Sequence, residues 1–459
     1  WNKVEKRMAR ILKFGFRFSY SKINIPRQKR LRSRIDMDLK SREDPVVLKL
    51  DTPEFQNIFN QEVIELKKLF DKYNYEIRIA GGAVRDLLLG QQAKDLDFAT
   101  TATPQEMKDM FTAENVRMIN MAGEKHGTVT PRINDKENFE VTTLRIDMVT
   151  DGRHAEVEFT KDWKLDANRR DLTINSMFLG FDGLVYDYFY GYEDLQKRRI
   201  AFVGDADVRI KEDYLRIMRY FRFYGRIAES ANNHDQHTLD VIKQNADGLT
   251  NVSGERIWME LKKTLQGNFS GDLLKKMLEV NIGPYIGLPN PNIKELDKLL
   301  KRSKHLDLQP MSFLAALLNN IDDATLLHAR LKFSNYDRDM IYFIVENRDR
   351  DDESAPRPLL PYEKIVLNTK IKQQDAYDYV VEVLKYRGEE KLLEDFKKWV
   401  IPRFPVNGKI LKENGYMPGK MYSHIIYKLK DMWIESEYQL GIDDLVKLIP
   451  SIVDKNKIK

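Results

Sequence analysis

The chain of 459 residues contains no cysteine, and this absence narrows its chemistry at once. Disulfide bonds, iron–sulfur clusters, cysteine-ligated zinc and a thiol nucleophile are excluded, and the composition suits a reducing compartment. No run of about 18 apolar residues occurs, so no membrane-spanning helix is predicted. Seven scattered histidines without a His-x-x-x-His helix argue against a zinc site; one of them, His126, is expected to satisfy its hydrogen bonds at a strand start. No Gly-x-x-x-x-Gly-Lys-Ser/Thr loop is found, which excludes a P-loop.

The residues that are present suit an ordinary folded protein, with 42% hydrophobic and 32% charged side chains. At this length, roughly two to four domains are expected. The net charge of +5 hides an asymmetry, because residues 1–34 hold 12 of the 76 basic side chains and one of the 71 acidic ones. The remainder is therefore slightly acidic. If the folded part binds nucleic acid, it must do so through local basic patches.

The basic segment opens the chain. Residues 1–34 interleave Arg and Lys with aromatic side chains, and we interpret residues 1–45 as a disordered leader that targets mitochondria. A disordered basic tail without targeting function and an arm that grips RNA are the alternatives. The chain begins with Trp1, and Met37, just past the basic stretch, is a candidate start for a shorter product in the cytosol or nucleus.

From about residue 52 the pattern is that of a folded protein. Apolar spacing predicts a helix over 61–73, and alternation predicts a strand over 75–80 that leads into Gly81 and Gly82. Further strands are expected at 115–120, 127–134, 138–146 and 155–160, the middle two joined by a polar turn. After about residue 190 helical periodicity dominates, and 349–361 is the best linker candidate.

Two aspartates separated by one residue follow the glycine turn. Positions i and i+2 of a strand share a face, so the carboxylates of Asp95 and Asp97 converge on one point. Hard oxygen ligands suit Mg²⁺, and two ions about 3.5–4 Å apart can activate a hydroxyl and stabilise leaving pyrophosphate. A turn at Gly82 would let the backbone approach a phosphate. Glu140, on the strand at 138–146, is either a third acid facing the metals or an ordinary exposed strand residue.

A second block combines an acid with arginines. The segment 211–222 is expected to form one helix, on which Asp213 and Arg216 are neighbours. In the simpler interpretation they form an intrahelical ion pair. In the functional interpretation, Asp213 accepts a hydrogen bond from the exocyclic amine of cytosine or adenine, and Arg216 donates a hydrogen bond to the same base edge. Guanine and uracil present an oxygen at that position, so this helix would select CTP and ATP.

These blocks resemble those of the class II (eukaryotic and bacterial) CCA-adding enzymes, within the nucleotidyltransferase and poly(A) polymerase superfamily. The likeness extends from about Pro53 to beyond Trp433. It implies Mg-dependent, template-independent addition of CCA to the 3′ end of tRNA from CTP and ATP, with release of pyrophosphate. A bacterial-type poly(A) polymerase and a non-catalytic RNA-binding protein on the same fold are the alternatives. The Gly-Arg-Arg-Phe stretch typical of such polymerases is missing from 115–124, which favours CCA addition.

The resemblance also implies roles for individual residues. Asp95, Asp97 and Glu140 would be catalytic, and the two aspartates would hold the metal. The implied nucleotide-binding residues are Gly82, Arg85, Arg170, Asp213, Arg216, Arg219 and Arg222, with Asp171 and Asn175 organising the sugar pocket. A flexible loop that helps the switch from CTP to ATP would include Asp151, Arg153 and His154, a mobile polar turn being the alternative.

The implied fold is an α+β head, with a small mixed sheet and flanking helices, followed by an all-α neck, body and tail in an elongated multi-domain shape. We place the head at 52–190, the neck with the nucleotide-selecting helix at 191–268, the body at 269–355 and the tail at 356–459. Transfer RNA is the expected partner, through its 3′ end, acceptor stem and elbow. Lysines between 409 and 430 would contact its phosphates or form a solvated face.

Overall fold

The computed structural model describes residues 40–454, except for 120, 151–154, 351–355 and 417–418. It divides the chain into two units, Trp1–Ser41 and Arg42–Lys459, and the second holds every element given below. Most of the leader predicted over residues 1–45, together with Met37, lies outside the described residues. No helix in the described ranges is long and apolar enough to cross a membrane.

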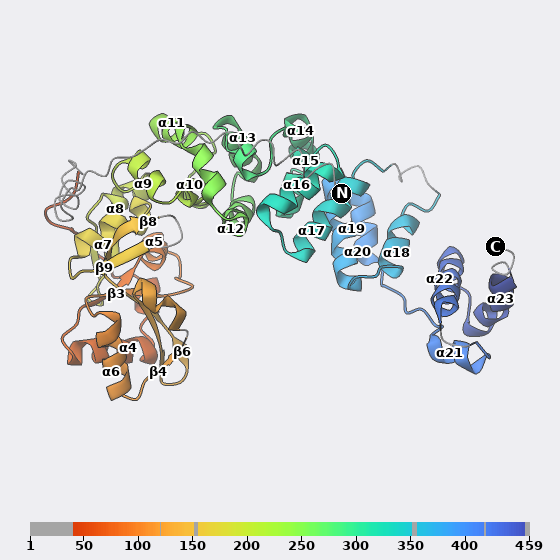
Figure 1. Cartoon of the computed structure of the whole chain (residues 1–459), viewed down its shortest axis with the longest axis horizontal. Coiled ribbons are helices and arrows are strands. Elements are labelled where there is room, and N and C mark those ends of the chain that lie inside the picture. The colour runs from red at the N-terminus through yellow and green to blue at the C-terminus, as the bar shows by residue number, and fades with distance from the viewer. Residues whose placement is uncertain (1–39, 120, 151–154, 351–355, 417–418, 455–459) are drawn as a thin grey trace, which may run out of the picture. The chain divides into compact units, whose positions relative to one another are not determined.

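One mixed sheet forms the centre of the head (Figure 1). Its strands are ordered β1-β11-β10-β2-β3-β7-β5-β4, and β6 pairs with β5. Only β3 and β7 of these neighbours run parallel; the other pairs are antiparallel. A separate hairpin is made by β8 and β9. The strands are β1 (Val46–Lys49), β2 (Ile77–Ala80), β3 (Asp97–Thr100), β4 (Arg117–Ile119), β5 (Thr128–Ile133), β6 (Glu137–Asn138), β7 (Glu140–Thr143), β8 (Arg145–Thr150), β9 (Ala155–Phe159), β10 (Phe178–Leu179) and β11 (Leu184–Tyr186).

Helices of the head start at residues that cap them. The Asn60 side chain accepts from the Val63 N–H at the start of α4, and Thr103 and Glu106 form a capping box at the start of α6. Apolar faces of these helices pack on buried strand residues such as Phe98 and Val141. The head helices and turns are α3 (Pro53–Gln56), α4 (Gln61–Lys72), α5 (Gly82–Leu88), α6 (Pro104–Ala113), η1 (Met121–His126), α7 (Trp163–Arg169) and η2 (Thr173–Asn175).

From α8 onward, the described residues form helices and 3₁₀ turns but no strand. One apolar core includes residues from the head and from helices as far as α19, and a second joins α21, α22 and α23. The elements are α8 (Gly191–Gln196), α9 (Ala206–Glu212), α10 (Leu215–Ile227), α11 (Gln236–Gln244), η3 (Ala246–Asn251), α12 (Gly254–Leu265), α13 (Ser270–Glu279), η4 (Gly283–Ile286), α14 (Ile293–Arg302), α15 (Pro310–Leu317), α16 (Ile321–Leu331), α17 (Asn335–Asn347), α18 (Leu360–Leu367), α19 (Gln373–Arg387), α20 (Glu390–Lys398), α21 (Gly408–Glu413), α22 (Lys420–Glu435) and α23 (Ile442–Asp454).

An α+β head followed by helices was predicted and is confirmed, but two predicted elements are wrong. The strand expected over 138–146 is divided at Leu144, a fully buried residue whose N–H donates to the Thr100 carbonyl while the chain turns into the β8–β9 hairpin. The helix expected over 211–222 is interrupted at Asp213, whose backbone is extended (φ −152°, ψ 106°). The domain boundaries stay predictions.

Candidate active site

A pocket of about 840 Å³ lies against the head sheet, α10 and α12, a size suited to a nucleotide. All the predicted catalytic and nucleotide-binding residues contribute to its lining, so the structure brings them together. They are Gly82, Arg85, Asp95, Asp97, Glu140, Arg170, Asp213, Arg216, Arg219 and Arg222. The predicted loop residues Asp151, Arg153 and His154 lie outside the described residues, between β8 and β9.

Carboxylates gather where two parallel strands begin. Asp97 is the first residue of β3 and pairs in register with Glu140, the first residue of β7. Asp95 lies in the bend that precedes β3, so the expectation that strand alternation orients both carboxylates is wrong for Asp95. Loss of water around the carboxylate raises the pKa of Asp97, the negative charges of Glu140 and Asp95 raise it further, and Arg170 opposes them. Such mutual repulsion is what a bound cation would relieve.

This donor set fits a divalent cation. Across the described ranges, no three His, Cys, Asp or Glu side chains come close enough together to enclose an ion. Asp95 and Asp97 would therefore supply only part of a coordination shell. Mg²⁺ is usually held in this way, by one or two carboxylates with water and substrate phosphates completing the shell.

The glycine turn after β2 requires a residue without a side chain. Gly81 has φ +66° and ψ −120°, a conformation that L-residues avoid, and a Cβ there would lie 3.1 Å from Arg170 Nη1. Gly82 then begins α5. The turn thus sets the backbone of Gly81 beside the Arg170 guanidinium at the pocket wall, and Gly82 follows.

Arg85 lines the pocket but is buried, with 2% of its surface exposed. Its guanidinium donates to Asp86 Oδ1 at 2.8 and 3.0 Å and to Asn175 Oδ1 at 2.5 Å, and it lies over the Phe223 ring. Burial lowers the pKa of Arg85. In this arrangement Arg85 links α5 to η2 and α10, which fits support of the pocket better than direct contact with a nucleotide.

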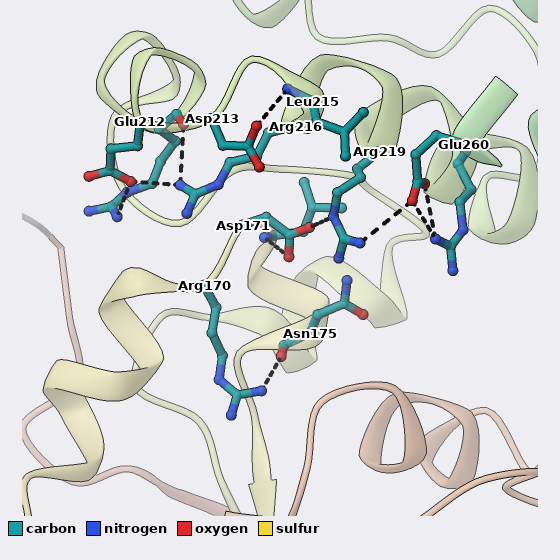
Figure 2. A network of polar contacts seen from close by, with 12 residues as sticks. Arg170, Asp171, Asn175, Glu212, Asp213, Leu215, Arg216, Arg219 and Glu260 are labelled. Atoms are coloured by element: carbon teal, nitrogen blue, oxygen red, sulfur yellow. Dashed lines mark hydrogen bonds and ion pairs between the residues drawn. The ribbon is translucent and has the colours of Figure 1, made fainter. Parts of the chain in front are cut away.

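Arg170 comes from the end of α7 and points towards η2 (Figure 2). It donates to Asp166 Oδ2 at 3.0 Å and to the Asn175 carbonyl at 3.2 Å. Burial lowers the pKa of Arg170, and Asp166 opposes that effect. Burial also disfavours the charge of Asp171, yet the Arg219 guanidinium holds the pKa of that carboxyl below its usual value. These pairs fix both charges at the pocket wall.

Asp213 and Arg216 both line the pocket. The Arg216 N–H donates to the Asp213 carbonyl at 2.9 Å, but among the described residues their side chains bond to other partners. Asp213 accepts from the Leu215 N–H at 3.1 Å and from Arg256 Nη2 at 2.8 Å. Arg216 donates to Glu212 at 2.7 Å and to the carbonyls of Arg209 and Arg169 (Figure 2). The extended backbone at Asp213 separates α9 from α10, so each side chain is held by its own partners.

Arg219 and Arg222 extend the same face of α10. Arg219 is bonded to Asp171, and Arg222 donates to both carboxylate oxygens of Glu260 at 3.0 and 3.2 Å. The Arg219 guanidinium lies 3.9 Å from Glu260 as well (Figure 2). These arginines of α10 are thereby paired with Asp171, which lies just before η2, and with Glu260 of α12. The pairs fix the arginine side chains before any ligand binds.

Comparison with known proteins shows the family to which the chain belongs. Residues 77–201 match the model of the poly A polymerase head domain, and residues 234–290 match that of a probable RNA and SrmB- binding site of polymerase A. The mitochondrial CCA tRNA nucleotidyltransferase 1 of Homo sapiens is 50% identical over 406 residues, covering 88% of this chain and 93% of the human protein. The chain belongs to the CCA tRNA nucleotidyltransferase family. The resemblance noted in the sequence is thus confirmed, and the poly(A) polymerase alternative is not favoured.

Other members show how widely the family resemblance extends. The Danio rerio enzyme is 50% identical over 408 residues, 88% of this chain and 94% of its own. A structure of the Bacillus stearothermophilus CCA-adding enzyme in complex with CTP is 25% identical, covers 89% of this chain and 100% of its own, and superposes with a TM-score of 0.67. The Thermotoga maritima CCA-adding enzyme complexed with tRNA, 17% identical over 87% of this chain and 98% of its own, has a TM-score of 0.59 and shares the fold.

Several pocket residues of this family member were not identified from the sequence. His126 ends η1 and lines the pocket, so its expected position as a strand-start residue is wrong. Arg145 donates to Asp147, two residues along β8, and burial lowers the pKa of Arg145. Other polar residues of the pocket include Lys94, Thr128, Thr142, Glu212, Arg226 and Arg256. Glu212 lies inside the segment 211–222, but no role was predicted for it. The sheet register and the packing of α10 and α12 bring these residues to the site.

Proposed function

We propose that this protein adds CCA to the 3′ end of tRNA, taking CTP and ATP without a nucleic-acid template. One observation carries the proposal: the acids Asp95 and Asp97 line the same pocket as the base-reading candidates Asp213 and Arg216. A module that only binds RNA has no use for the acid pair. A polymerase that adds only adenosine has no use for a site that also accepts cytosine.

The acids would hold Mg²⁺. Bound there, it supplies Lewis-acid activation of the primer 3′-hydroxyl and charge stabilisation for the leaving pyrophosphate. The 3′-hydroxyl releases its proton to solvent as its oxygen forms a bond to the α-phosphorus. The bond from that phosphorus to the bridging oxygen of the β-phosphate breaks, and pyrophosphate leaves. Asp95 and Asp97 must be ionised for this role, and the positive charge of Arg170 favours the ionised form of Asp97.

The triphosphate would lie against Gly82 and Arg170. The glycine turn lets phosphate oxygens approach the backbone, and a guanidinium can donate to two of them. Asn175 contributes a further donor, because its amide nitrogen is buried and has no hydrogen-bond partner among the described residues. A ribose hydroxyl is a suitable acceptor for that N–H, in keeping with a sugar pocket formed with Asp171.

The base would be chosen by the hydrogen-bond donors and acceptors on its edge, which must match those of Asp213 and Arg216. Two acceptor contacts leave the Asp213 carboxylate with free lone pairs for the exocyclic amine of cytosine or adenine. Arg216 has five N–H groups, and three donate to protein partners, so donors remain for a base acceptor. Each such pairing discriminates by about 1–3 kcal/mol, or roughly ten- to a hundredfold.

The test uses tRNA that ends before CCA, with CTP and ATP supplied separately and together. Sequencing of the products distinguishes defined CCA ends, an adenosine homopolymer and no extension. Asp97→Ala should abolish extension, whereas Asp109→Asn, which alters an exposed acid of α6 on the same domain, should extend normally. A homopolymer from the unaltered protein would overturn the proposal.

We also propose a mitochondrial location. The relatives from Homo sapiens, Danio rerio and Mus musculus, each 50% identical, are named mitochondrial enzymes, and residues 1–34 are rich in Arg and Lys. Fusion of residues 1–45 to a fluorescent reporter tests the targeting role directly. Reporter that stays outside mitochondria would contradict it.

A further inference from the structure

Two threonine hydroxyls face the pocket beyond the acid cluster. Thr128 of β5 and Thr142 of β7 lie opposite each other in the sheet, and their Oγ1 atoms are 2.9 Å apart. Both side chains are half-buried and line the pocket. The next residues, Val129 and Val141, point the other way and are buried in the core. Strand alternation therefore places the hydroxyl pair on the ligand face.

The pair has unused hydrogen-bonding capacity. Two hydroxyls carry two hydrogens, and the contact between Thr128 and Thr142 uses one. No other hydrogen bond involves either hydroxyl within the described ranges, so one hydrogen and several lone pairs remain. A ligand group that both donates and accepts matches this surface, and a ribose hydroxyl is such a group.

The sheet order places this pair on one particular side of the acids. From Asp97 on β3, one neighbour is β2, which leads to the glycine turn and Arg170; the other is β7, followed by β5. Thr142 lies two residues along β7 from Glu140, the register partner of Asp97. With strands about 4.8 Å apart and a rise of about 3.3 Å per residue, the Cα atoms of Thr142 and Asp97 are about 8 Å apart.

Phosphoryl transfer determines which part of the substrate reaches that side. The attacking and leaving oxygens lie roughly in line through the transferred phosphorus. If the triphosphate lies against Arg170 and Gly82, pyrophosphate leaves towards β2. The attacking 3′-hydroxyl must then arrive from the opposite side, over β7 and β5, where the threonine pair lies.

We propose that Thr128 and Thr142 form a subsite for the 2′-hydroxyl of the primer's terminal nucleotide, an inference that rests on the function proposed above. The subsite orients the terminal ribose so that its 3′-oxygen meets the α-phosphorus. It also gives the enzyme a reason to prefer RNA ends, since the 2′-hydroxyl is what distinguishes RNA from DNA. The two threonines act as positioning residues and take no part in bond making.

The experiment compares two tRNA primers that lack only the final adenosine, one with a normal terminal ribose and one with a 2′-deoxyribose. For the unaltered full-length chain, kcat/KM for ATP addition should be about five- to tenfold higher on the ribose primer, as expected for loss of one hydrogen bond. Thr142→Val and Thr128→Val keep the side-chain shape and should bring that ratio close to one by slowing only the ribose primer. Thr142→Ser should keep the ratio, and the preference for CTP over dCTP should be unchanged in every variant.

Each contrary result has a defined meaning. Equal use of both primers by an otherwise active wild type would refute the subsite while leaving CCA addition intact. Equal losses on both primers in the valine variants would show a merely structural role. A changed preference for CTP over dCTP would assign the pair to the incoming nucleotide instead. Failure of the wild type to extend either primer would defeat the proposed function itself, and the subsite with it.

Discussion

Replacing Gly81 with alanine tests how the glycine turn supports the pocket. Gly81 has φ +66° and ψ −120°, and forcing an L-residue into such a sparsely populated region costs about 1–3 kcal/mol. The new Cβ would also lie 3.1 Å from Arg170 Nη1 and 3.6 Å from the Asn175 carbonyl oxygen. The first distance is shorter than an ordinary contact, so the Arg170 guanidinium must move by a few tenths of an ångström.

Arg170 is the group that the proposed mechanism needs for the triphosphate. Its Nη1 donates to the Asn175 carbonyl at 3.2 Å, and the displaced guanidinium loses its fixed position at the pocket wall. A hydrogen bond to a charged group contributes about 1.5–3 kcal/mol. Loss of about half of that raises KM for CTP and ATP on the order of tenfold, while base choice, set on α10, stays as in the wild type.

Gly90→Ala provides the matched control. Gly90 also has a positive φ, +69°, but a Cβ there would meet no atom within 4 Å. Both variants should therefore unfold at lower temperature than wild type in thermal denaturation, and only Gly81→Ala should show a raised KM in steady-state extension of tRNA. Equal KM values for the two variants would refute the link between the turn and Arg170.

Three further predictions concern the acids and the base-reading residues. Asp97→Asn should yield no extension product yet melt at a higher temperature than wild type in metal-free buffer, because it removes a charge that Glu140 and Asp95 oppose. The raised pKa of Asp97 means that its ionisation reduces the stability of the metal-free protein as pH rises through that pKa. Thermal denaturation of metal-free wild type, Asp97→Asn and the Asp109→Asn control over a series of pH values measures this, and only Asp97→Asn should lose that part of the pH dependence. Arg216→Ala should retain some transfer but incorporate UTP and GTP, as sequencing of products formed with all four nucleotides would reveal; continued exclusion of both would refute the role of Arg216.

The acid pair and the glycine turn could be predicted because their geometry is local. A strand that ends in two glycines and a following Asp-x-Asp depend on residues a few positions apart, and the structure places Gly82, Asp95 and Asp97 at one pocket. Glu140 could be named as a candidate for a similar reason, because it begins a strand in which apolar and polar residues alternate. What sequence alone left open was the parallel pairing of β3 with β7 that brings Glu140 beside Asp97.

The conformation at Asp213 could not be predicted, because distant residues impose it. Helical periodicity continues through 211–222, and local propensity favours one helix. In the structure the Tyr214 ring packs against Gly248, where any Cβ would lie 2.0 Å from the ring, and Asp213 accepts from Arg256 at 2.8 Å. These contacts join segments more than thirty residues apart, and they override the local preference for a continuous helix.

Burial likewise distinguishes two arginines to which the family resemblance gives the same role. Arg85 and Arg170 are both arginines of the predicted nucleotide site, but Arg85 is fully engaged by Asp86 and Asn175 within the protein. The difference depends on Phe223 of α10, which covers the Arg85 guanidinium. A motif that names the residue type cannot reveal this contact, because Phe223 lies more than a hundred residues further along the chain.

The charged pocket is ordered by contacts between α10 and the segments around the sheet. Arg226 of α10 donates to Asp86 of the head at 2.8 Å, and Arg219 of α10 bonds to Asp171. Each pair reduces the electrostatic repulsion among the arginines of α10. The two pairs also hold α10 in position relative to the sheet that carries the acids. Because Asp213 lies two residues before α10, its position in the pocket that it shares with Asp97 depends on these same pairs. The sequence can therefore identify both halves of the site from their motifs, whereas the spacing between them is set by ion pairs that join residues far apart in the chain.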